Sequence, residues 1–182
     1  WDYELAINHL EKYQQQDGLS AYNKLIAQVN ILFGFVFLEK YSEGQQLALE
    51  LLQKTKESAS NLLYANTLEA ISEIQINLGN YDEASNYLRE AENLIQDSGS
   101  VDFFLIQKQK LFLHIRELGF TQLTQEKFDN FLLEAKKRKR YETIREMDFF
   151  KAKILNDFEL ASQVFAGTPY PGFRRSEEHT SE

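Results

Sequence analysis

The sequence predicts an all-α protein built from stacked helical hairpins, and three observations support this. An aromatic residue precedes a small residue by three positions at four places, where the aromatic members are Tyr3, Tyr41, Tyr81 and Phe158. These lie 38, 40 and then 77 residues apart, so the pattern recurs about every forty residues with one member degraded. Apolar residues recur at helical spacing, and both prolines lie near the C-terminal end. A period near forty is typical of solenoids.

The first half of the chain is expected to form five helices separated by short turns. Their ranges are about 2–16, 20–38, 41–56, 60–78 and 82–95, each with apolar residues every three or four positions. Asp17-Gly18 ends the first helix and Gly79-Asn80 ends the fourth. Ser20, Ser42 and Asp82 are residue types that cap helix N-termini, so we expect them to start the second, third and fifth helices.

The second half is expected to form four helices, at about 101–118, 124–137, 141–155 and 158–165. The loop 97–100 is the clearest break before them, and Gly119 separates the first two. Asn156-Asp157 makes a short turn, and Gly167-Thr168-Pro169 ends the last helix. Phe128, Met147 and Phe150 are among the apolar residues expected to face inward. The whole chain thus alternates helices with short loops and carries no strand signal.

One stretch carries a family resemblance. Gly79 and Tyr81, followed by Ala84 and Ala91, resemble the second half of a tetratricopeptide repeat, although the period here exceeds that family's usual thirty-four. The resemblance implies a right-handed superhelical solenoid of antiparallel hairpins. In such hairpins a small residue lets two crossing helices approach closely. The expected repeat-packing residues are Tyr41, Gly44, Gly79, Tyr81, Ala84, Ala91, Phe158 and Ala161.

The resemblance also implies a class of function. Longer-helix variants of such repeats occur in bacterial regulators, so we expect an interaction or sensor module of a larger cytoplasmic protein. It would bind a protein, a peptide, a helix or a neighbouring domain in a groove. The first helix of each pair lines the concave face in this family, which places Asn66, Glu69 and Glu73 toward a partner. Plain solvation also explains the polarity of these three residues, and it is the favoured of the two interpretations.

The residues indicate no reaction centre. The chain has no cysteine, and His9, His114 and His179 have no metal-ligand spacing. Neither a phosphate loop nor a nucleophile motif occurs, so we expect no enzyme activity, no cofactor and no metal. A net charge of −8 argues against nucleic acid as the partner. The strongest apolar run, residues 31–38, is too short to span a membrane.

Five consecutive cations occupy positions 136–140. They form either a patch for an acidic partner or nucleic acid, or the solvated end of a helix. The second interpretation is favoured because cations complement the carbonyl end of a helix dipole, and five residues across a helix and a turn point in several directions.

The ends of the sequence suggest a fragment of a longer protein. We assign residues 1–166 to the repeat domain and 167–174 to a linker or truncated end. Residues 175–182 read RSEEHTSE, which resembles a translated sequencing adapter and is expected to be non-biological. The chain also opens with Trp1 rather than Met. An alternative function follows: a regulatory region of a transcription regulator or kinase whose attached output domain lies outside this sequence.

Overall fold

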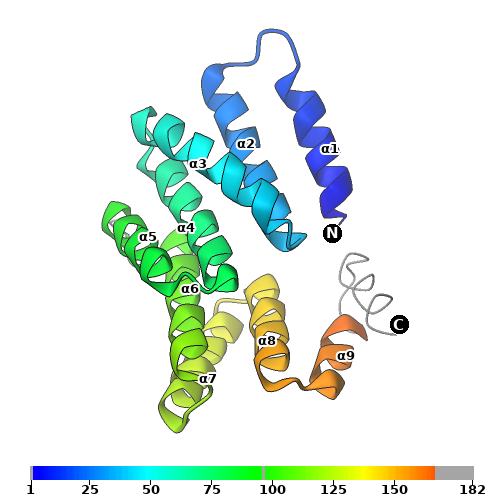
Figure 1. The fold of residues 1–182 in the computed structure, drawn as a ribbon, viewed down its shortest axis with the longest axis vertical. Coiled ribbons are helices and arrows are strands. Elements are labelled where there is room, and N and C mark those ends of the chain that lie inside the picture. Colours follow the sequence, from blue (N-terminus) through cyan, green and yellow to red (C-terminus); the bar gives the residue numbers. More distant parts are fainter. Residues whose placement is uncertain (1, 96, 167–182) are drawn as a thin grey trace. The chain divides into compact units, whose positions relative to one another are not determined.

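The computed structural model describes residues 2–95 and 97–166, and every regular element in that part of the chain is an α-helix (Figure 1). The prediction of an all-α fold is therefore confirmed for the described residues. The helices are α1 (Tyr3–Gln14), α2 (Ala21–Phe37), α3 (Tyr41–Glu57), α4 (Asn61–Leu78), α5 (Tyr81–Leu94), α6 (Val101–Leu118), α7 (Gln122–Lys137), α8 (Tyr141–Leu155) and α9 (Phe158–Ala166).

The described residues fall into two compact units, 2–113 and 114–166, and the division lies within α6. The sequence had suggested one repeat domain over 1–166, so the structure divides that range in two. The expected linker 167–174 and the tail 175–182 lie outside the described residues.

In the unit 2–113, α1 packs against α2, α2 against α3, α3 against α4 and α4 against α5, and α2 also contacts α4. One apolar cluster joins α2, α3 and α4, and a second joins α4, α5 and α6. Because α4 belongs to both clusters, most of its surface is buried, from Leu63 to Ile76. The apolar core is thus continuous through a row of helical hairpins rather than closed around one centre.

The turns inside the hairpins repeat with the predicted period. A residue with positive φ follows α2, α4 and α6, at Glu39, Gly79 and Gly119, each forty positions after the last. After the first two, the next backbone N–H donates to a carbonyl five residues back: Lys40 to Phe35 and Asn80 to Gln75, both at 2.9 Å. This left-handed closure satisfies carbonyls that the helix end would leave unpaired. The same closure also follows α7 and α8, where Arg140 donates to Ala135 and Asp157 donates to Ala152, so the forty-residue spacing holds for the turns at 39, 79 and 119 and not for every closure of this kind.

Two of the three predicted N-caps are wrong. Ser20 caps α2, since its hydroxyl accepts a hydrogen bond from the backbone N–H of Asn23 at 3.2 Å. However, α3 begins at Tyr41 with Lys40 as N-cap, and α5 begins at Tyr81 with Asn80 as N-cap. Ser42 and Asp82 lie inside the first turns instead. The tight turn leaves no room for an extra residue, so the last residue of the turn, Lys40 or Asn80, is also the N-cap of the next helix.

A small buried residue follows each of these turns. Gly44 and Ala84 are buried near the starts of α3 and α5, and a Cβ on Gly44 would lie 3.0 Å from Cδ1 of Ile74 in α4. Thr124, at the matching position in α7, is also fully buried, and its hydroxyl donates to the Gly119 carbonyl at 2.7 Å. The third hairpin turn, which looked degraded in sequence, thus buries a larger residue at this position, and the hydroxyl of that residue is satisfied.

The other packing residues of the unit 2–113 differ in depth. Ala91 is fully buried, whereas Tyr41 and Tyr81 are half-buried and each covers one edge of an apolar cluster. Gly79 adopts φ +82° at the C-terminal cap of α4, a conformation that favours glycine. Tyr41 and Tyr81 therefore cover the apolar core from its periphery and do not form its centre.

In the unit 114–166, α7 packs on α8 and α8 packs on α9. Phe128 and Met147 are fully buried there, and the ring of Phe120 meets that of Phe128 edge-on at 5.4 Å. The unit therefore has an aromatic centre of its own.

The last aromatic-x-x-small pair departs from the expectation. Phe158 is 81% exposed and Ala161 is half-buried, so Phe158 does not have the packing role assigned to it. The physical reason is positional. Tyr81 is covered by a cluster that includes residues of the following helix α6, whereas α9 is the last helix of the described residues.

Candidate functional site

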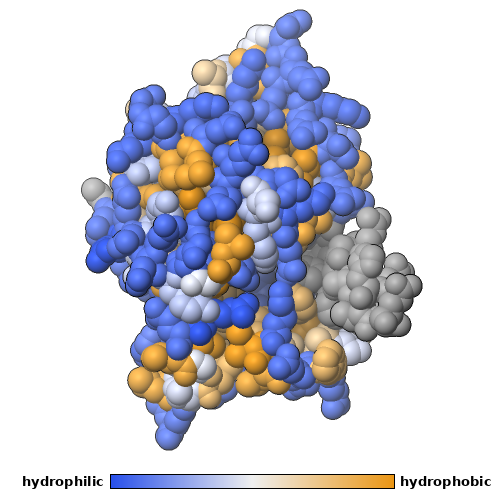
Figure 2. All heavy atoms as spheres, viewed as in Figure 1, coloured by the Kyte–Doolittle hydropathy of each residue, from blue (hydrophilic) through white to orange (hydrophobic). Residues whose placement is uncertain are grey.

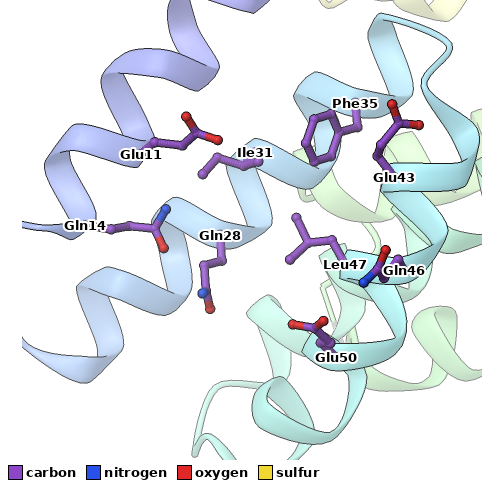
Figure 3. A pocket seen from close by; sticks show the side chains of 9 residues that line it. All are labelled: Glu11, Gln14, Gln28, Ile31, Phe35, Glu43, Gln46, Leu47 and Glu50. Atoms are coloured by element: carbon purple, nitrogen blue, oxygen red, sulfur yellow. The ribbon is translucent and has the colours of Figure 1, made fainter.

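A groove opens between α1 and α3, and α2 forms its floor (Figure 3). We call it the α1–α3 groove, and its volume is about 330 Å³. The lining residues are Glu11 and Gln14 of α1, Gln28, Ile31 and Phe35 of α2, and Glu43, Gln46, Leu47 and Glu50 of α3. All of them belong to the unit 2–113.

The lining residues recur at helical spacing, so the groove runs along its helices. Ile31 and Phe35 are four residues apart on α2, and Glu43, Leu47 and Glu50 are spaced by four and three on α3. Such positions share one helix face. Seven residues of helix rise about 10 Å, so the trough is about two helical turns long.

The floor of the groove is apolar and its rims are acidic. Ile31 is buried, and Phe35 and Leu47 are half-buried beside it. Figure 3 shows the carboxylates of Glu11 and Glu43 on opposite walls, with Ile31 and Phe35 between them. The lining contains three carboxylates, three glutamine amides and no cation. The groove therefore offers apolar contact at its base and hydrogen-bond acceptors at its edge.

The three rim carboxylates are not satisfied within the protein. Among the described residues, Glu11, Glu43 and Glu50 make no ion pair or hydrogen bond with another side chain, and all three are exposed. They also form no cluster that could hold a metal ion in that part of the chain. Their negative charge is therefore open to an external partner.

The repeat explains why the α1–α3 groove is hollow. In the following repeat, the corresponding gap is the one between α3 and α5, and we call it the next gap. Leu52 of α3 and Tyr87 of α5 lie there and pack against both apolar clusters. The chain period places Gln14 at the position of Leu52, and Leu47 at that of Tyr87. A glutamine and a leucine replace a leucine and a tyrosine, so less apolar volume enters the first gap.

The predicted partner-binding residues lie elsewhere, on α4. Asn66 and Glu73 are half-buried, and Glu69 is only 3% exposed. The side-chain amide of Gln109 in α6 donates to Glu73. The structure thus does not gather these residues in an open groove, because α6 packs along that side of α4. Burial of Glu69 in particular differs from the expectation that it faces a partner.

Sequence reasoning missed the α1–α3 groove, although one signal existed. Aligning the chain on its own period sets Gln14 against Leu52 and so marks the first gap as the more polar. To use that comparison, one must know which residues face which gap between helices, and only the fold shows this.

The cationic run 136–140 lies at the end of α7. Arg138 caps that helix, and its Nε donates to Oε1 of Glu134 at 2.8 Å, which together with Lys137 lowers the pKa of that carboxyl. Lys139 takes positive φ in the turn, and residues 136–139 are exposed. This geometry fits the helix-end interpretation, in which cations surround a carbonyl terminus.

Polar residues predominate on the face shown in Figure 2, where apolar residues form separate patches. Scattered exposed apolar side chains are normal on protein surfaces and indicate no site by themselves. No helix among the described residues is both long and apolar enough to cross a membrane.

Comparison with known proteins gives no relative: no family model, no curated protein and no solved structure matches the chain.

Proposed function

We propose that this chain is a helical-repeat binding module of the tetratricopeptide-like kind, which takes a segment of another protein into the α1–α3 groove. The observation that carries the proposal is the pairing of repeated hairpins with an unfilled gap between α1 and α3. Repeat arrays of this kind commonly expose extended binding surfaces.

The shape of the groove favours a helical segment as the ligand. Its apolar floor and its rims follow i, i+3, i+4 and i+7 positions, which is the spacing at which a helix presents its own anchors. Three glutamine amides can donate to or accept from polar groups of such a segment. A right-handed superhelix and a place in a larger cytoplasmic regulator belong to the same proposal.

A test fills the groove without unfolding the protein. The double variant Gln14→Leu/Leu47→Tyr copies the residues that fill the next gap, so the fold should tolerate it. Peptides selected on the wild-type chain from an unbiased display library should lose binding to this variant. The matched control Gln122→Leu/Leu133→Tyr makes the same exchanges at exposed positions of α7 and should keep binding.

The proposal is wrong if selected peptides bind the filled variant as tightly as they bind the wild type. Far-UV circular dichroism and thermal melting would show that the filled variant is folded, so that loss of binding reports on the groove.

A further inference from the structure

The next gap shows how this fold satisfies a carboxylate at the position of Glu50. Glu90 lies forty residues after Glu50 and occupies the same position on α5 that Glu50 occupies on α3. The hydroxyl of Tyr64 donates to its Oε1 at 2.6 Å, and the ammonium of Lys56 lies 3.9 Å from the same oxygen. The Lys56 ammonium also lies 5.5 Å from the centre of the Tyr64 ring. The Tyr64 hydroxyl and the Lys56 ammonium, which lies over the Tyr64 ring, thus together satisfy Glu90.

The α1–α3 groove has the carboxylate without those donors. The period places Gly18 where Lys56 would be and Lys24 where Tyr64 would be. Lys24 is exposed, is not part of the groove lining, and makes no ion pair within the described residues. Glu50 therefore keeps its acceptor oxygens while the two groups that satisfy Glu90 are missing.

Two further carboxylates along the groove also lack a hydrogen-bond donor or a cation from another side chain of the described residues. Glu43 lies seven residues before Glu50 on α3, and Glu11 lies on the facing wall (Figure 3). An apolar floor between acidic rims is complementary to a helix with a narrow apolar stripe and cations on both sides of it. The chain as a whole carries −8, so its field also attracts such a segment.

We propose that the ligand of the α1–α3 groove is a basic amphipathic helix, whose apolar side chains rest on Ile31, Phe35 and Leu47. Its Lys or Arg side chains pair with Glu11, Glu43 and Glu50. This inference rests on the proposed function and adds the chemical class of the partner to it.

The probe for the test is a fluorescein-labelled helical peptide of about 14 residues, four turns long. It has Leu at i, i+3, i+4 and i+7 positions and Lys on both flanks. A matched peptide carries Glu in place of every Lys. Fluorescence anisotropy should show binding of the Lys peptide, with an affinity that falls as salt rises, and much weaker binding of the Glu peptide.

The groove carboxylates are tested by the triple variant Glu11→Gln/Glu43→Gln/Glu50→Gln. Three exposed ion pairs together should change affinity for the Lys peptide by about tenfold. The control variant Glu117→Gln/Glu126→Gln/Glu159→Gln removes the same number of charges at exposed positions in the other unit, 114–166. It should change the affinity by less than about twofold, because these three carboxylates do not line the groove and add only to the screened field of the chain.

The inference would be overturned by equal binding of the Lys and Glu peptides, by equal loss in the two triple variants, or by no binding of the Lys peptide. These outcomes leave the proposed function intact if display-selected peptides still require an unfilled groove. A charge-reversed variant, Glu11→Lys/Glu43→Lys/Glu50→Lys, supplies a gain-of-binding readout: it should prefer the Glu peptide.

Discussion

Gly34 lies near the C-terminal end of α2, where that helix packs against Ile7 of α1. A Cβ added there would lie 2.8 Å from Cγ1 and 3.0 Å from Cδ1 of Ile7, which is itself buried. Real Cβ atoms do not approach other carbons so closely, so Gly34→Ala must displace Ile7 or α1. Ile7 cannot easily rotate away, because a β-branched residue in a helix has one strongly preferred χ1.

Two opposing effects set the magnitude. Alanine is favoured over glycine in a helix interior by about 1 kcal/mol. Overpacking a filled contact costs about 1–3 kcal/mol. The clash should prevail in the wild-type background, so Gly34→Ala should lower the free energy of unfolding by about 1 kcal/mol.

A second background separates the two effects. Ile7→Ala alone should cost about 2–5 kcal/mol, because it removes a buried side chain. It also removes both carbons that the new Cβ would meet, so only the helix preference remains. In this background Gly34→Ala should therefore stabilise the protein, by about 1 kcal/mol.

The measurement is urea unfolding of the four proteins of the cycle, followed by far-UV circular dichroism. The reasoning predicts a reversal of sign between the two backgrounds. If Gly34→Ala has the same effect with Ile7 and with Ala at position 7, the close packing of α1 on α2 is not what requires this glycine.

Three further predictions concern the repeat and one tyrosine. Ala84→Leu should lower the free energy of unfolding by about 1–3 kcal/mol, because Ala84 is fully buried; an unchanged melting curve would contradict its placement. Gly79→Ala should cost about 1–2 kcal/mol through its positive φ alone, because a Cβ there meets no atom; chemical denaturation would reveal a smaller loss if the turn relaxes. Burial, then the hydrogen bond to Glu90, raises the pKa of Tyr64 to about 12, so its contribution to stability is complete below pH 10 and is lost as pH rises toward 12. Tyr64→Phe should flatten the dependence of stability on pH in that window, and an unchanged slope would show that Tyr64 titrates normally.

The helices could be predicted because their ends carry local signals. Gly79 stops α4 through a backbone conformation that other residues adopt with strain, and apolar spacing defines the faces between such stops. The exact first residues could not be predicted. Ser42 and Asp82 are good capping residues, but the turn geometry made Lys40 and Asn80 the caps.

The candidate groove could not be predicted from local signals, since it depends on what two sequence-distant helices do not fill. Gln14 and Leu47 are unremarkable on their own helices. Only the packing shows that they stand where Leu52 and Tyr87 close the next gap. Conversely, the polar character of Glu69 suggested exposure, and tertiary packing buried it.

Lys40 and Asn80 each end one helix and begin the next, since their N–H groups close the preceding helix while their carbonyls accept from Gly44 and Ala84. A connection in which one residue serves both helices has no residue to spare. Inserting a single amino acid there would disrupt the end of one helix and the start of the next, and a rotation of one helix would move the other. We therefore expect changes in length to be tolerated as whole forty-residue modules or within longer connections, such as residues 15–20 between α1 and α2.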